Sequence, residues 1–207
     1  IITIVLAGAG CASSGLTSSA SKESNTESTK AIPYIEIQNP SGFVNAEPFT
    51  LANLVGKKVI LVDILTYSCI NCIRTFPYLT DWYEKYRDDG LEIVGIHTPE
   101  FAFEKKKANV EEAMKKYGIT FPIVMDNDYA TWNAFDNRYW PHKYLIDING
   151  NIVYDHIGEG GYAETEAKIQ TLLMERMSKL KIDVALPHEI SSEDNVTFNP
   201  EQIGSPE

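Results

Sequence analysis

Cysteine and histidine are scarce in this sequence, which holds three cysteines and four histidines among its 207 residues. A small fold held together by disulfides would need more cysteines in a shorter chain. A structural zinc site would need a second clustered pair of ligands, and no two histidines have the H-x(3–5)-H spacing. We therefore expect no metal and no bound cofactor.

Basic residues are also in deficit, with 18 Lys and Arg against 29 Asp and Glu and a formal net charge of -11. The phosphate backbone of a nucleic acid binds basic surfaces and repels acidic ones, so no nucleic-acid partner is expected. A dinucleotide site is not expected either, because the glycines at positions 158, 160 and 161 lack the G-x-G-x-x-G pattern.

Long apolar runs are missing too. The chain begins with ten mostly apolar residues, 1–10, whereas a membrane-spanning helix needs about 20. Together with Cys11, these residues are typical of the end of a secretory signal peptide with a lipobox. We expect residues 1–11 to be a truncated signal segment that is cleaved before a lipid-modified Cys11. The alternative is the ragged end of a longer membrane helix with an incidental cysteine.

Residues 12–31 are rich in Ser and Thr and have few apolar side chains, so burial cannot offset the entropy lost on ordering them. We expect a flexible tether between an anchored Cys11 and a folded domain. Such a tether would hold the domain at the outer face of the cytoplasmic membrane or in the periplasm. Residues 183–207 also lose periodicity, and we expect a linker there.

Residues 32–182 have the composition of one folded domain. Apolar runs that predict buried strands lie at residues 59–62, 91–96 and 121–125, and each precedes a segment with helical spacing. Asn149 and Gly150 predict a two-residue hairpin turn before the last amphipathic helix, at residues 162–180. This order predicts an α/β fold in which helices flank a central mixed β-sheet.

Cys69 and Cys72 form a CxxC motif where a predicted strand gives way to a predicted helix. A cysteine at a helix N-terminus faces unpaired N–H groups and the positive end of the helix dipole, which favour the thiolate. Such a setting lowers a thiol pKa from about 8.5 to roughly 3.5–7.5. Cys72 lies one turn further into the helix and is expected to be recessed. We therefore expect Cys69 to attack a disulfide and Cys72 to resolve the product.

The residues around this motif resemble those of thioredoxins. Asp63 stands six residues before Cys69, and Pro77 stands five after Cys72, which are the offsets of the buried acid and the helix-kinking proline in that family. The stretch at residues 67–75 is more specifically similar to the membrane-associated redoxin-like thioredoxins of the DipZ type. These are relatives of the TlpA and ResA thiol-disulfide oxidoreductases.

The chain departs from the family pattern after Asp63, where Ile64 and Leu65 replace the usual aromatic pair. Substrate preference and reduction potential are therefore not transferred to this chain. The resemblance implies a thioredoxin-like fold with a redoxin-type N-terminal extension and an internal strand–helix insertion. Residues 203–207 resemble the entry to the extra C-terminal domain of some DipZ-type proteins, so the linker at residues 183–207 is expected to lead to such a domain.

The resemblance also implies roles for residues near the cysteine pair. Asp63, buried below the pair, would assist removal of the proton from Cys72. Pro141 matches the proline that lies against the pair after a cis peptide bond, and Trp140 would present its backbone to a substrate chain. The residues that flank the cysteines would also contact the substrate: Tyr67, Ile70 and Asn71.

The function implied by the resemblance is that of an extracytoplasmic thiol-disulfide oxidoreductase. Its partners would be protein thiols and disulfides, and a membrane electron donor of the CcdA/DsbD type would recharge it. The spacer formed by Ile70 and Asn71 does not fix a reduction potential, so the physiological direction of exchange stays open.

Two other functions compete with this one. Thr66 and Cys69 reproduce half of the PxxxTxxC motif of AhpC/TSA-like peroxiredoxins, and Arg138 could supply a stabilising cation. However, Val62 stands where the proline of that motif should be. The second alternative is a non-enzymatic tethered binding module, in which Cys69 and Cys72 form a structural disulfide.

Overall fold

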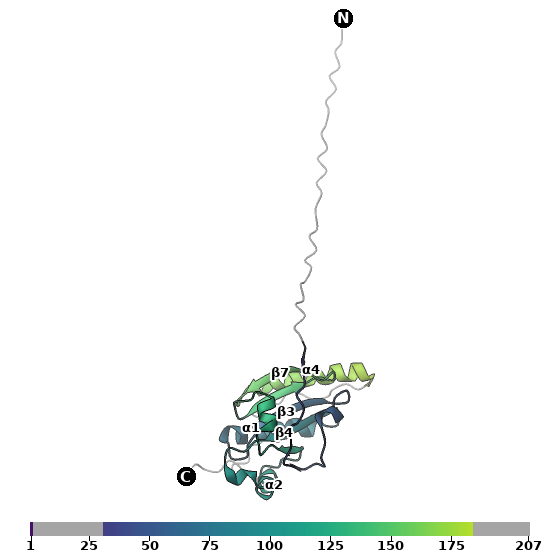
Figure 1. Ribbon diagram of the computed structural model, residues 1–207. Helices are drawn as coiled ribbons and strands as arrows, with labels where there is room; N and C mark the ends of the chain where they lie inside the picture. The colour runs from purple at the N-terminus through teal and green to yellow at the C-terminus, as the bar shows by residue number, and fades with distance from the viewer. Residues whose placement is uncertain (2–30, 184–207) are drawn as a thin grey trace. The chain divides into compact units, whose positions relative to one another are not determined.

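The computed structural model describes residue 1 and residues 31–183 (Figure 1). The folded domain expected at residues 32–182 lies inside this range. The signal segment with Cys11 lies outside the described residues, apart from residue 1. The tether and the C-terminal linker also lie outside them, apart from residues 31 and 183.

The domain is built on one seven-stranded sheet with the order β1-β7-β6-β3-β4-β5-β2. The three strands β3, β4 and β5 pair in parallel, whereas β6 is antiparallel to β3 and β7 is antiparallel to β6. The sheet is therefore mixed, as expected. Its strands are β1 (Ile32–Pro33), β2 (Gly42–Val44), β3 (Val59–Leu65), β4 (Leu91–His97), β5 (Ile123–Met125), β6 (His142–Ile146) and β7 (Asn151–Ile157).

Helices cover both faces of the sheet. Residues of α1, α2 and α4 belong to one apolar cluster, and residues of α3 and the 3₁₀-helix η1 belong to a second cluster. In Figure 1, β3 and β4 lie in the middle of the domain, with β7 and α4 toward one side of the view and α2 toward the other. The helices are η1 (Leu51–Asn53), α1 (Ile70–Tyr86), η2 (Ala102–Lys105), α2 (Lys107–Lys116), α3 (Ala130–Ala134) and α4 (Tyr162–Leu180). Within the described part of the chain, none of them combines the length and apolar character that a membrane crossing requires.

Strand β3 is buried along its whole length because both faces of the sheet are covered. Successive side chains of a strand point to opposite faces. Leu61 and Leu65 belong to the cluster that contains Cys72, and Ile60 and Val62 belong to the other cluster. Asp63 shares the parity of Leu61 and Leu65, so the strand directs its carboxyl group toward the side of the sheet that carries α1.

The predicted hairpin is present, but its turn differs from the prediction. Strand β6 ends at Ile146 and β7 begins at Asn151, so four residues connect them. The carboxylate of Asp147 accepts hydrogen bonds from the N–H groups of Asn149, at 2.9 Å, and Asn151, at 2.8 Å. Gly150 has a φ of 82°. The prediction of a two-residue turn was wrong because the side chain of Asp147 organises a longer loop.

Candidate active site

Cys69 and Cys72 lie at the start of α1, just beyond the end of β3. Cys69 is the N-cap residue, with extended backbone angles (φ -71°, ψ 117°), and it is partly exposed. Cys72 lies one turn further in and is fully buried. Both are free thiols in the structure. Only Cys69 is therefore placed to meet a partner molecule, as the sequence predicts.

The two thiols differ strongly in acidity. The pKa of Cys69 is lowered from 9.0 to about 6, chiefly because the Cys72 thiol donates a hydrogen bond to its sulfur. Burial opposes this shift, and the backbone N–H groups of Cys72 and Asn71 add to it. Burial raises the pKa of Cys72 well above 9.0, and the neighbouring Cys69 and Asp63 raise it further. At neutral pH the pair therefore holds one thiolate, on Cys69, and one thiol, on Cys72.

Asp63 lies below the cysteine pair and faces a buried lysine. Its Oδ1 is 3.7 Å from Nζ of Lys143, and both side chains are almost completely buried. Burial raises the pKa of Asp63 from 3.8 to about 6, and the charge of Lys143 limits the rise. Neither carboxylate oxygen has a hydrogen-bond partner among the described residues. Asp63 can therefore accept a proton near neutral pH more readily than an ordinary aspartate.

The Trp140–Pro141 peptide bond is cis, as the resemblance implies. The carbonyl oxygen of Trp140 lies 3.9 Å from Sγ of Cys69, which places this loop directly against the outer sulfur. The indole Nε1 of Trp140 donates to the carbonyl oxygen of Thr98 at 3.1 Å, and this bond fixes the ring. The fold thus brings the Trp140–Pro141 bond next to the CxxC stretch at residues 67–75.

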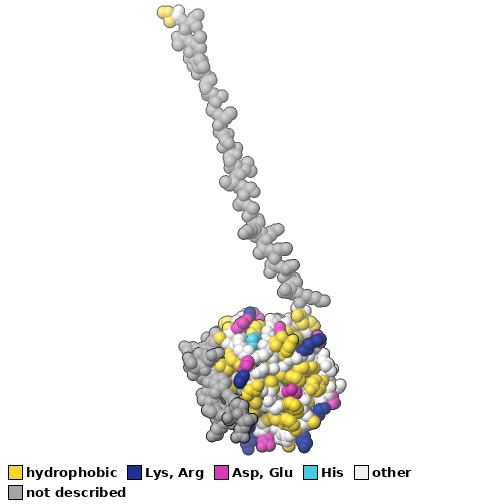
Figure 2. All heavy atoms as spheres, turned by 90° about the vertical axis from the view of Figure 1, so that its left-hand side faces the viewer, with side chains coloured by type: hydrophobic (Ala, Val, Ile, Leu, Met, Phe, Trp, Pro, Cys, Tyr) yellow, Lys and Arg dark blue, Asp and Glu magenta, His cyan; other side chains and the backbone are white. Residues whose placement is uncertain are grey.

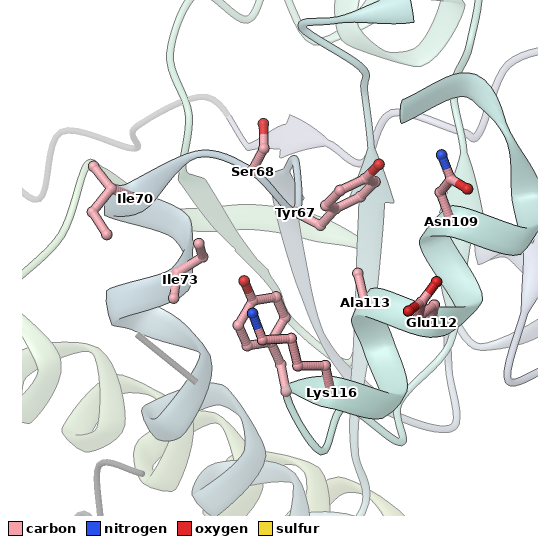
Figure 3. A pocket seen from close by; sticks show the side chains of 9 residues that line it. Tyr67, Ser68, Ile70, Ile73, Asn109, Glu112, Ala113 and Lys116 are labelled. Carbon is pink, nitrogen blue, oxygen red and sulfur yellow. The ribbon is translucent and has the colours of Figure 1, made fainter. Parts of the chain in front are cut away.

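A pocket of about 740 Å³ opens beside the cysteines, between α1 and α2. Tyr67 and Ile70 line it, whereas Asn71 contributes its backbone N–H to Cys69. Figure 3 shows the side chains on its two sides: Ile70 and Ile73 from α1, and Asn109, Glu112, Ala113 and Lys116 from α2. The aromatic ring of Tyr67 lies between the two helices. It also stacks on the ring of His97, with 5.4 Å between the ring centroids.

Two charged residues of this region were missed by the sequence analysis. Lys143 is a buried lysine on β6, directly opposite Asp63 in the register of the sheet. A lysine within an apolar strand was the available signal, but only the strand pairing identifies its partner. Glu104 is buried in η2 and contacts Ser68, the residue before Cys69. No sequence pattern connects these two positions.

We expect iodoacetamide to modify Cys69 well before Cys72 in the reduced protein. The rate should rise with pH through a midpoint near pH 6, because only the thiolate reacts and the pKa of Cys69 is lowered to about 6. Peptide mass spectrometry after timed labelling measures both rates. Equal rates, or a Cys69 midpoint near the ordinary thiol value of about 8.5, would contradict the assignment.

The raised pKa of Asp63 also predicts a pH dependence of stability. Between pH 3.8 and about 6, the folded protein holds a proton that the unfolded chain releases, so the free energy of unfolding falls as pH rises through this window. This shift in the pKa of Asp63 corresponds to a loss of roughly 3 kcal/mol in the free energy of unfolding across the window.

We expect Asp63→Asn to lack this part of the pH dependence. Urea unfolding of the unsubstituted protein and of Asp63→Asn over a pH series measures the free energy of unfolding. Asp88→Asn, which removes an exposed carboxyl, is the control. The Asp88→Asn curve should run parallel to that of the unsubstituted protein. A parallel curve for Asp63→Asn would show that the buried carboxyl does not titrate in this window.

Comparison with known proteins places the chain in a family. Residues 28–173 match the Redoxin family. Protein DipZ of Mycobacterium tuberculosis is 43% identical over 150 residues, which cover 71% of this chain and 21% of DipZ. Thiol-disulfide oxidoreductase YkuV of Bacillus subtilis is 29% identical over 69% of this chain and 95% of YkuV. The chain therefore spans about a fifth of DipZ and nearly all of YkuV.

The fold has close counterparts among solved structures. The solution structure of a thioredoxin-like protein in the oxidized form covers 70% of this chain and 97% of its own length, with a TM-score of 0.64 and 28% identity. The thioredoxin-like fold expected from the sequence is confirmed. YkuV and a further relative, ResA of Bacillus subtilis, which is 33% identical over 65% of this chain and 69% of ResA, are both named thiol-disulfide oxidoreductases. The chain belongs to the Redoxin family.

Proposed function

We propose that this chain exchanges electrons with protein cysteines, outside the cytoplasm, through the dithiol and disulfide forms of Cys69 and Cys72. The observation that carries the proposal is the difference between the two sulfurs. Cys69 is partly exposed with a pKa lowered to about 6, whereas Cys72 is buried with a raised pKa. A nucleophile and a resolving thiol need this difference.

In the first step, the thiolate of reduced Cys69 attacks one sulfur of a partner disulfide. A bond forms between the two sulfurs, the partner's disulfide bond breaks, and the departing sulfur leaves as a thiolate that takes a proton from solvent. The product is a mixed disulfide between Cys69 and the partner.

In the second step, Cys72 must lose its proton before it can attack. Asp63 is the nearby base: its charge acts on Cys72, and its pKa of about 6 allows it to hold a proton transiently. The Cys72 thiolate then attacks Sγ of Cys69 and releases the second partner thiol. The pair ends as a disulfide, two electrons have passed to the partner, and a membrane electron donor of the CcdA/DsbD type would restore the dithiol.

The surroundings of Cys69 suit a protein partner. The carbonyl oxygen of Trp140 beside the sulfur can accept a hydrogen bond from an extended segment, in the manner of strand addition. Exposed apolar side chains gather on the surface of the domain (Figure 2), and Ile70, the neighbour of Cys69, is 44% exposed. Tyr67 and Asn71 complete the proposed contact with the substrate.

The peroxide-reducing alternative has less support from the geometry. The hydroxyl of Thr66 donates to Glu104 at 2.5 Å, so its hydrogen is not available to a peroxide bound at Cys69. Arg138 is exposed and pairs with Asp136 at 3.1 Å. Neither residue therefore takes the part that a peroxiredoxin site would require of it.

We also propose that the domain is anchored to the outer face of the cytoplasmic membrane through a lipid on Cys11, with residues 12–31 as its tether. The support is the sequence pattern of this segment. A Cys11→Ser variant should move from the membrane fraction to the soluble fraction of cells, as followed by immunoblotting. Retention of the variant in the membrane fraction, with its leader cleaved, would reject the anchor.

The exchange reaction is tested by trapping. We expect Cys72→Ser to accumulate a mixed disulfide with a denatured, disulfide-bonded protein, because Cys69 still attacks and nothing resolves the product. Dithiothreitol should release the partner, and Cys69→Ser should trap none. Non-reducing gels with mass spectrometry identify the linked cysteine. Equal trapping by both variants, or by neither, would reject the proposed function.

A further inference from the structure

Glu104 is a fully buried carboxylate that holds two segments next to the cysteine pair. Its Oε1 accepts hydrogen bonds from the hydroxyls of Thr66, at 2.5 Å, and Ser68, at 2.6 Å, and from the N–H of Ser68, at 3.3 Å. Its Oε2 accepts from the N–H groups of Glu100, at 2.6 Å, and Phe101, at 2.8 Å. Five donors thus converge on one side chain.

The carboxylate of Glu104 forms no ion pair with any residue that the structure describes, and hydrogen bonds keep it ionised. Burial alone would raise its pKa, but the hydrogen bonds from Ser68, Thr66 and the backbone together lower it. The ring of His97 lies 3.5 Å from the Thr66 hydroxyl, and burial lowers the pKa of this histidine to about 4. At neutral pH His97 is therefore uncharged. The negative charge of Glu104 is stabilised by its hydrogen-bond donors, and the carboxylate in turn holds these donors in place.

These donors lie in the short connection between β3 and Cys69. Thr66 follows the last residue of β3, and Ser68 precedes Cys69. The backbone N–H of Thr66 also forms a hydrogen bond with Cys72. The placement of both sulfurs therefore depends on a connection that Glu104 ties to the loop at residues 100–101.

We propose that Glu104 is a positioning residue for Cys69, which acts through Ser68 and Thr66 to hold the turn where the thiolate receives its hydrogen bonds. The bonds to Cys69 come from the Cys72 thiol and from the N–H groups of Asn71 and Cys72, and all of them are directional. A mobile turn would weaken them together. The role of Glu104 in the reaction rests on the proposed exchange function, but its effect on the Cys69 thiolate can be measured without a partner protein.

The test is the pH profile of Cys69 alkylation in Glu104→Gln. The glutamine amide nitrogen cannot accept a hydrogen bond, so one end of the network is lost while the side-chain volume is kept. We expect the midpoint for Cys69 to move up by about one pH unit, which is roughly a tenfold lower thiolate fraction in mildly acidic buffer. Removal of a negative charge by itself would move the midpoint down, so an upward shift reports the loss of positioning.

Two further variants make the result specific. Ser68→Ala removes a single donor and should move the midpoint in the same direction by less; it decides the question if Glu104→Gln does not fold. Glu166→Gln is the matched control. Glu166 is also fully buried, and it accepts from the Tyr86 hydroxyl at 2.7 Å at the other end of α1. The Glu166→Gln variant should unfold at a lower urea concentration, but the pH midpoint of Cys69 alkylation should not change.

If both variants fold and the pH midpoint of Cys69 alkylation is unchanged or lowered in each, the proposal is overturned. Glu104 would then have a structural role alone. Failure of the exchange function would appear differently. The unsubstituted protein would then form no mixed disulfides, whatever the alkylation profiles of these variants show.

Discussion

The hydrogen bond that the Cys72 thiol donates to the sulfur of Cys69, at the start of α1, is the interaction on which the site depends. It is the largest cause of the lowered pKa of Cys69. It forms because a short connection joins the end of β3 to the start of α1, so that Cys69 takes the N-cap position and Cys72 lies one turn further into the helix. The central strand, the connection after it and the first turn of the helix therefore form one chemical unit.

Buried charges surround this unit, and each has a different means of stabilisation. Asp63 lies opposite Lys143 on the adjacent strand, and neither of its carboxylate oxygens has a hydrogen-bond partner among the described residues. Its raised pKa makes it a group that can exchange a proton. Glu104 accepts five hydrogen bonds, and its lowered pKa keeps it ionised. One carboxyl is thus suited to move a proton, and the other is suited to hold a loop.

The sequence predicted the parts of the site that depend on local order. The CxxC motif after an apolar run placed Cys69 at a helix start. The spacing of Asp63 and Pro77 from the cysteines matched a known family, and the resemblance to that family pointed to Pro141. It could not identify Lys143 or Glu104 as neighbours, because their partners are set by strand register and by loops far apart in the sequence. The prediction of the hairpin turn was wrong for a similar reason, because hydrogen bonds to the side chain of Asp147 set the length of the turn.

The central claim is that Cys69 and Cys72 form a redox-active pair and not a structural disulfide. The most direct test is an equilibrium titration of the pair against glutathione or dithiothreitol buffers, with the thiol and disulfide forms separated after acid quenching. The account predicts a reduction potential above about -300 mV, in the range of catalytic pairs. A pair that stays oxidised to potentials below about -300 mV would contradict it, because structural disulfides behave in that way.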